Sequence, residues 1–272
     1  MDATIGRTQL RLYTHNIFAR RAGWSERRAL LREGVEQLRP DVVLFQEEVL
    51  GDEFDQTSDI LGPGFHIAHS AGRSSQESSG ISIASRWPIS AVHEINLTDG
   101  GPPVEEFVWT TLIATIDTHA GPVVVANHFP DATVQREAER VRQAALAARA
   151  LEQLAAPDVP VVIAGDFDAE PDAASLRLLL GKEPVDDLGI AYIRAWDSAH
   201  PGRPCVTFNP ENPLHAMELP GWPFTQIDHV LVRCLPTGLA SLRVDACEMV
   251  HDIPRNGVWA SDHVGLVADL SF

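Results

Sequence analysis

The chain has 272 residues, of which 44% are hydrophobic and 22% charged, and its net charge is −17. Lys and Arg are needed to neutralise nucleic-acid phosphates, so this balance argues against non-specific binding of a polyanion. The three cysteines form no CxxC pair, which argues against a Cys-rich zinc site or a disulfide framework. No apolar run has the length of a signal peptide or a transmembrane segment, and we expect a cytoplasmic protein.

The first third of the chain predicts two strands separated by a helix. Alternating apolar and polar residues indicate a strand over 8–16, and helical spacing of leucines and valines indicates a helix over 25–39. Ser25 is the expected N-cap of this helix, and Pro40 ends it. Residues 41–47 form a short apolar run that is typical of a strand buried on both faces.

The middle of the chain predicts more strands and one long helix. Residues 80–89 indicate a strand followed by a proline turn, and 109–118 with 121–129 indicate a hairpin. A helix is expected from about 133 to 154. A buried strand that contains Gly165 comes next.

The last third begins with a short helix near 173–180 and then loses its periodicity. Residues 181–226 are rich in Pro, Gly, Asn and His, and we interpret them as long functional loops. Strands return at 227–233 and at 263–270. Interleaved strands and helices with several hairpins favour an α/β domain with mixed sheets.

Polar residues that bind cations or move protons adjoin almost every apolar strand. Sites in layered α/β folds form where strand ends and loops converge, so these residues are candidates for one site. They are Asn16, Glu47, Asn127, His128, Asp166, Asp168, Asp228, Asp262 and His263.

Each of these residues also has a structural interpretation. Glu47 could be a solvated strand end, Asn16 could form a turn, and His128 could be a hydrogen-bonded core residue. Asp166 could cap the next helix, and Asp228 could pair with a neighbour in the sequence. Their occurrence together, in this order, favours a functional site.

In this order the motifs resemble those of the endonuclease/exonuclease/phosphatase superfamily, which has the deoxyribonuclease-I-like fold. The matching segments are the strand ending in Asn16, Gln46-Glu47, Ser85-Arg86-Trp87-Pro88, Asn127-His128, Gly165-Asp166-Phe167-Asp168, Ile227-Asp228-His229 and Ser261-Asp262-His263. The resemblance implies a single catalytic domain over residues 1–272. It also implies a four-layer α/β sandwich, with two packed mixed β-sheets flanked by helices, and a divalent metal ion.

Two positions depart from the family pattern. The family motif GDFN has Asn in its fourth place, where this chain has Asp168, and a carboxylate cannot donate a hydrogen bond unless it is protonated. Gln226 stands where many relatives have Arg before Ile-Asp. These departures leave open whether Asp168 binds metal, pairs with a cation or is a tolerated variant.

The chemistry of phosphodiester hydrolysis then suggests roles for the residues that match the family motifs. Glu47, with Asn16 and Asp262, is the expected ligand set for Mg²⁺ or Mn²⁺. Asn16, Arg86 and Asn127 are expected to contact the substrate.

The expected acid–base residues are His263, Asp228, Asp166, His128 and Asp168. His263 would act on the attacking water, Asp228 would orient its ring, and Asp166 is the rival base. His128 would stabilise the phosphorane or protonate the leaving oxygen.

The sequence therefore predicts a metal-dependent phosphoric ester hydrolase. We expect a small or lipid-like phosphodiester rather than long DNA, with a phosphomonoesterase, a nuclease or an inactive ligand-binding member as alternatives. A dinuclear metallophosphoesterase would need an early Asp-x-His and a late His-x-His, which are absent. An aspartyl-nucleophile phosphatase would carry its Asp-x-Asp near the N-terminus.

Substrate specificity is expected from the loops around 50–80, 93–107 and 181–225. Trp222 and Trp259, which lie in loop-like segments, could form an apolar wall beside the site or could pack under the long loops. The oligomeric state does not follow from the sequence.

Overall fold

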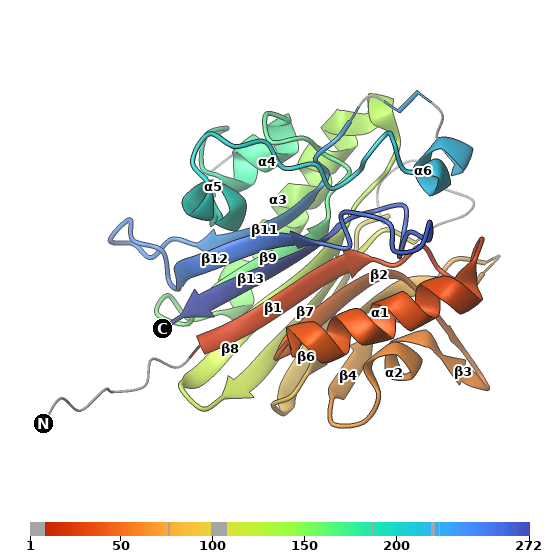
Figure 1. Cartoon of the computed structure of the whole chain (residues 1–272). Helices are drawn as coiled ribbons and strands as arrows, with labels where there is room; N and C mark the ends of the chain where they lie inside the picture. Colours follow the sequence, from red (N-terminus) through yellow and green to blue (C-terminus); the bar gives the residue numbers. More distant parts are fainter. Residues whose placement is uncertain (1–8, 76, 99–107, 186–187, 219–220, 223) are drawn as a thin grey trace, which may run out of the picture.

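The computed structural model describes residues 9–75, 77–98, 108–185, 188–218, 221–222 and 224–272. Within these ranges the chain forms two mixed β-sheets that pack face to face, with helices on both outer faces (Figure 1). This arrangement confirms the expected four-layer α/β sandwich. The loop expected at 93–107 lies in part outside the described residues.

The first sheet has seven strands in the order β12-β13-β1-β2-β5-β4, with β3 paired to β2. Strand β1 runs parallel to β2 and antiparallel to β13, so both ends of the chain contribute to its centre. The strand bounds are β1 Gln9–Asn16, β2 Val42–Gly51, β3 Phe54–Asp55, β4 His66–His69, β5 Ser79–Ser85, β12 Arg243–Val250 and β13 Gly265–Ser271.

The second sheet has six strands in the order β10-β11-β9-β8-β7-β6. Only β8 and β9 are parallel, and the long helix connects them. The strand bounds are β6 Ile89–Asn96, β7 Thr110–Thr118, β8 Gly121–Phe129, β9 Val161–Asp166, β10 Tyr192–Arg194 and β11 Asp228–Arg233.

Three apolar clusters correspond to the three interfaces between the layers. The inner faces of the two sheets form the central core, which joins residues such as Leu12 and Leu44 to Leu112 and Val125. Helices α1 and α2 cover the first sheet, and α3 and α4 cover the second (Figure 1). The helix bounds are α1 Trp24–Leu38, α2 Gln56–Leu61, η1 Val134–Arg136, α3 Glu137–Leu154, α4 Ala174–Leu179, α5 Ala195–Ala199 and α6 Pro213–Glu218.

The structure corrects several local predictions. The N-cap of α1 is Gly23, which adopts φ 68°, and Ser25 lies inside the helix. Strand β2 continues to Gly51, four residues beyond the predicted end, and contains a β-bulge after Gln46. The predicted loop 181–226 contains β10, α5 and α6, and the predictions missed β12 entirely.

The described helices include none that is long and apolar enough to cross a membrane.

Candidate active site

Strand topology brings the predicted polar residues to one edge of the two sheets. Asn16 pairs with Gln46 at the ends of the parallel strands β1 and β2. Because β13 runs antiparallel to β1, the residues that precede β13 return to the same edge. In the second sheet, Asp228 at the start of β11 pairs directly with Asp166 at the end of β9.

A β-bulge in β2 separates Glu47 from the regular hydrogen-bond ladder. The register with β5 passes from Gln46 opposite Ile81 to Glu48 opposite Gly80, so Glu47 has no partner residue on β5. Glu47 adopts φ 56°, a left-handed conformation that is uncommon for a residue with a side chain. Local backbone strain of this kind persists where the surrounding structure imposes it, often at functional sites.

Asn16 links the two sheets through its side-chain amide. Its Nδ2 donates to Glu47 Oε1 at 3.0 Å and to Asp166 Oδ2 at 3.0 Å. Its Oδ1 accepts from the backbone N–H of Phe18, which fixes the orientation of the amide. Asn16 therefore holds a carboxylate from each sheet at a defined separation.

His263 lies between two aspartates of the second sheet. Its Nδ1 is 3.0 Å from Asp228 Oδ2, and its Nε2 is 3.7 Å from Asp166 Oδ2. Burial disfavours the imidazolium, but the charges of Asp228 and Asp166 outweigh this effect and raise the pKa of His263 above its ordinary value. Burial raises the pKa of Asp166 to about 7, against the opposing effect of His263.

Asp262 and His263 belong to a turn that is held from both sides. The Ser261 hydroxyl lies 2.7 Å from the Asn16 carbonyl oxygen and 3.0 Å from Asp262 Oδ1. The buried amide of Asn212 donates to the carbonyl oxygens of Ser261, at 2.8 Å, and Asp262, at 3.2 Å. The turn thus connects β1, β13 and the loop that precedes α6.

His128 and Asp168 adjoin this cluster through Gly165 and Asp166. His128 pairs with Gly165, and its Nδ1 is 2.7 Å from Thr111 Oγ1. Burial lowers the pKa of His128 to about 3, so its ring is neutral at neutral pH. A Cβ on Gly165 would lie 2.3 Å from the carbonyl oxygen of His128, which explains why glycine occupies this position.

Asp168 is buried and adopts φ 49°, a conformation that Asn and Asp tolerate better than most residues. Its backbone N–H donates to Asp166 Oδ1 at 3.2 Å. Burial and the neighbouring Asp166 raise the pKa of Asp168 well above its ordinary value. A protonated carboxyl can donate a hydrogen bond, as the amide of the family's Asn does.

Two predicted substrate-binding residues do not join the cluster. The Asn127 amide is fully used between the sheets, because Oδ1 accepts from Gln46 and Nδ2 donates to two carbonyl oxygens of the first sheet. Arg86 follows Ser85, which pairs with Val42 at the start of β2, whereas Glu47 lies at the bulge further along that strand, after Gln46. The Arg86 guanidinium donates to the Pro40 carbonyl oxygen and covers the Phe65 ring. Both residues therefore have structural contacts instead.

The sequence did not reveal two arginines that shape the site. Arg21 NH1 lies 3.4 Å from Glu47 Oε2, and Arg21 also pairs with Glu77 at 2.9 Å. The buried Arg27 donates to the carbonyl oxygens of Ile17 and Ala260, so it connects the loop after β1 to the segment before Asp262. Their only sequence signal is their position shortly after Asn16, which is too weak to distinguish them from other arginines.

The chemistry of the cluster fits a divalent cation. Glu47 Oε2, Asp168 Oδ2 and Asp228 Oδ1 are buried carboxylate oxygens with no hydrogen-bond partner. Asp166, Asp228 and His263 also form one of two groups of described side chains whose spacing could hold a metal ion. Hard oxygen ligands of this kind are those that Mg²⁺ and Mn²⁺ prefer.

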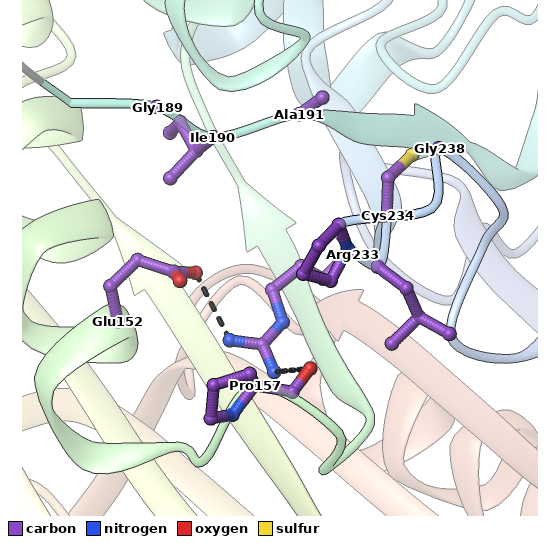
Figure 2. Close-up of a pocket in the computed structure, with 10 residues that line it drawn as sticks. Glu152, Pro157, Gly189, Ile190, Ala191, Arg233, Cys234 and Gly238 are labelled. Carbon is purple, nitrogen blue, oxygen red and sulfur yellow. Dashed lines mark hydrogen bonds and ion pairs between the residues drawn. The ribbon is translucent and has the colours of Figure 1, made fainter.

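A separate hollow of about 320 Å³ lies at the opposite end of β11 from Asp228 (Figure 2). Arg233 extends into it, and its guanidinium bonds to Glu152 and to the carbonyl oxygens of Ala156, Pro157 and Val159. These contacts are internal to the fold, so Arg233 serves to join β11 to the segment between α3 and β9.

Residues 13–263 match the Endonuclease/Exonuclease/phosphatase family, a range that contains every residue of the cluster. The chain belongs to this family. Its members are typically hydrolases of phosphate esters, and they typically depend on a divalent metal ion. None of the curated proteins matches the chain.

Solved structures of the endonuclease/exonuclease/phosphatase family share the fold at low sequence identity. The human Nocturnin catalytic domain with bound sulfate is 18% identical, with a TM-score of 0.75 over 98% of this chain and 95% of that one. A family protein from Bacteroides vulgatus is 18% identical, with a TM-score of 0.73 over 98% and 100% of the two chains.

D. rerio TDP2 in complex with a single-strand DNA product is 16% identical, with a TM-score of 0.73 over 97% and 100% of the two chains. Because that protein binds DNA, the comparisons do not support our expectation that long nucleic acid is an unlikely substrate.

Proposed function

We propose that the chain is a divalent-metal-dependent phosphodiesterase that hydrolyses its substrate by attack of water. The observation that carries this proposal is the chain of contacts from Glu47 through Asn16 to Asp166, and on to His263 and Asp228. It joins candidate metal ligands to candidate proton-transfer groups within one buried cluster. Within this cluster the buried Asp228 Oδ1 has no hydrogen-bond partner and is available to a cation.

Glu47 and Asp262, with Asn16, would hold Mg²⁺ or Mn²⁺. The bound ion would polarise a phosphoryl oxygen and neutralise charge in the transition state. Asn16 Nδ2 already donates to both Glu47 and Asp166, so the amide would orient these carboxylates. Arg21, next to Glu47, adds a positive charge at the same end of the site.

Asp166 is the group we assign to receive the proton of the attacking water. The carboxylate of Asp228 can only accept, so Nδ1 of His263 carries a hydrogen, and the nearby Asp166 favours a hydrogen on Nε2 as well. An imidazolium is a poor base but a strong donor to a phosphoryl oxygen. His263 would therefore stabilise the charge that develops on the phosphoryl group.

His128 and Asp168 would complete the site as neutral hydrogen-bonding groups. The low pKa of His128 favours stabilisation of the phosphorane over proton transfer to the leaving oxygen. Protonated Asp168 would donate as the family's Asn does. Asn127 and Arg86 have no role in this proposal, because their contacts hold them elsewhere.

The test is hydrolysis of bis-p-nitrophenyl phosphate and p-nitrophenyl phosphate with Mg²⁺, with Mn²⁺ and with EDTA. We expect turnover of the diester that EDTA abolishes and that His263→Ala reduces by about 10²–10⁴-fold. Preference for p-nitrophenyl phosphate would instead identify a phosphomonoesterase. Turnover that persists in EDTA would contradict the metal-dependent mechanism.

A nuclease acting on single strands is the second candidate, and the similarity to a TDP2 structure with a single-strand DNA product favours it. The net charge of −17 opposes it, because few cations are available to neutralise phosphates. A short single-stranded oligonucleotide, compared with a small diester at equal concentration, distinguishes these substrates.

A further inference from the structure

His215 on α6 is buried near the catalytic cluster without a hydrogen bond. Its side chain is 3% exposed, and neither Nδ1 nor Nε2 has a hydrogen-bond partner. In the described part of the chain, each of the other four buried histidines makes at least one ring hydrogen bond. His215 is therefore an exception that the fold itself does not explain.

The position of His215 is set by the turn that carries Asp262 and His263. Asn212 Oδ1 accepts from the backbone N–H of Leu214 at the start of α6, while its Nδ2 donates to the carbonyl oxygens of Ser261 and Asp262. One buried side chain thus fixes α6 to the catalytic turn. The ring of His215 is held in place relative to His263 by the same contact.

Phe208 connects the two histidines. Its ring centroid lies 4.1 Å from that of His215 and 4.5 Å from that of His263. Trp222 packs at 6.5 Å from Phe208, and its Nε1 is a second buried polar atom without a partner. Two unpaired polar groups therefore lie in one largely buried aromatic cluster, which contacts His263 through Phe208.

Leaving a buried polar group unpaired costs about 1–3 kcal/mol, so such groups are uncommon unless something else pairs with them. An aromatic lining with isolated polar atoms suits an uncharged organic group rather than a phosphate. Burial lowers the pKa of His215, which leaves its ring neutral, with one donor and one acceptor.

We propose that His215, assisted by Trp222, binds the organic part of the phosphate ester by hydrogen bonding to a hydroxyl group or to the polar edge of a base. This inference rests on the proposed function, because the cluster around Asp166 must hold the phosphate for the organic part to reach His215. Specificity among esters then depends on α6 and its flanking loop.

The experiment is calorimetric titration of the Mg²⁺-loaded protein with three phosphomonoesters, the product type of the proposed reaction. Glycerol 3-phosphate offers hydroxyl groups, thymidine 5′-monophosphate offers hydroxyl and base groups, and phenyl phosphate offers neither. The variants are His215→Phe, which keeps a ring against Phe208, His215→Gln, which keeps a donor and an acceptor, and Trp222→Phe. Thermal melting confirms that each variant is folded.

We expect His215→Phe to weaken binding of at least one polar ester by about tenfold, with phenyl phosphate unchanged. His215→Gln should recover most of the loss, and Trp222→Phe should show a smaller loss of the same kind. A loss confined to thymidine 5′-monophosphate would identify a base edge, and a loss with both polar esters would identify a hydroxyl. Equal losses for all three ligands, no loss, or no binding to the wild type would overturn the proposal.

Turnover of bis-p-nitrophenyl phosphate by the wild type is measured in parallel. Absent turnover with an intact His215-dependent preference would reject the hydrolytic function and keep the binding role. Normal turnover with unchanged binding in His215→Phe would reject the binding role alone. If His215→Phe does not fold, Trp222→Phe tests the binding role in its place, with His215→Gln as the control that should keep the preference for polar esters. Trp222→Phe must then reduce this preference, and an unchanged preference would overturn the proposal.

Discussion

Two clusters in this protein have the same composition, two carboxylates and a histidine, but only one of them is paired with an arginine among the ion pairs of the described residues. In the cluster of Asp166, Asp228 and His263, the ring of His263 is the charged partner of both carboxylates, and Asp228 Oδ1 has no hydrogen-bond donor. In the cluster of Glu48, Asp55 and His69, the guanidinium of Arg73 pairs with Glu48, which is 0% exposed.

The internal contacts of the second cluster are those of a structural network. His69 joins Glu48 Oε1 at 3.1 Å to Asp55 Oδ2 at 3.3 Å, and Asp55 also caps α2. Buried charges need partners, and this cluster obtains its cation from the chain itself. The cluster around Asp166 has too few cations of its own, which makes it the one that fits a metal ion.

The largest expected effect is a loss of activity on substitution in the cluster around Asp166, with no such loss in the cluster of Glu48, Asp55 and His69. Asp166→Ala should lower kcat by about 10²–10⁴-fold, because it removes the proposed acceptor of the water's proton. His69→Ala is the matched control in the structural cluster, and its kcat per folded molecule should stay close to that of the wild type. Equal losses in the two variants, measured with bis-p-nitrophenyl phosphate, would show that the clusters do not differ as we infer.

The second effect is a loss of stability on substitution in the cluster of Glu48, Asp55 and His69. Arg73→Met removes the guanidinium that pairs with the buried Glu48, leaves only the His69 ring of the ion pairs described above, and should lower the free energy of unfolding by about 3–5 kcal/mol. The double variant Glu48→Gln/Arg73→Met should regain much of this loss, since no buried charge remains. Urea unfolding of the four proteins measures it, and a double variant as unstable as Arg73→Met would refute the explanation.

Mg²⁺ should stabilise the protein through the site around Asp166 and not through the cluster of Glu48, Asp55 and His69. Mg²⁺ at a hundred times its dissociation constant should stabilise the protein by about 2.7 kcal/mol. Glu47→Gln should reduce this stabilisation, because it weakens the proposed ligand set, whereas Asp55→Asn should leave it intact. Melting temperatures with Mg²⁺ and with EDTA provide the measurement, and a loss confined to Asp55→Asn would place the ion in the structural cluster.

The pH dependence of stability follows from the raised pKa of Asp166. A carboxyl whose pKa is about 7 in the folded protein and about 3.8 when unfolded binds its proton more tightly in the folded state. Without metal, its contribution should be present below about pH 4 and be lost progressively as the pH rises to about 7. Asp166→Asn should flatten this part of the curve of unfolding midpoint against pH, and an unchanged curve would argue against the raised pKa.

The smallest effect is expected at Asp168. Asp168→Asn places the family's residue in the motif and keeps a side chain that tolerates φ 49°. We expect activity to hold or rise and Mg²⁺ affinity to stay unchanged, because a protonated carboxyl and an amide donate alike. A clear fall in Mg²⁺ affinity would instead identify Asp168 as a metal ligand.

The sequence alone determined the layer composition and most of the candidate site. Period-two alternation and buried apolar runs identify strands such as Gln9–Asn16 and Val161–Asp166 locally. Polar residues at their ends could be recognised for the same reason. Strand β12 was missed because a β-bulge between Val244 and Ala246 interrupts its alternation of apolar and polar residues.

Only the tertiary structure decided which strand ends meet. Arg86 and Asn127 resembled site residues in the sequence, but strand register places the first at the opposite edge and the second between the sheets. The pairing of Glu48 with Arg73 and the position of His215 beside the catalytic turn also join distant segments. A local pattern reports which face a side chain occupies, whereas strand order and charge pairing depend on contacts between residues far apart in the chain.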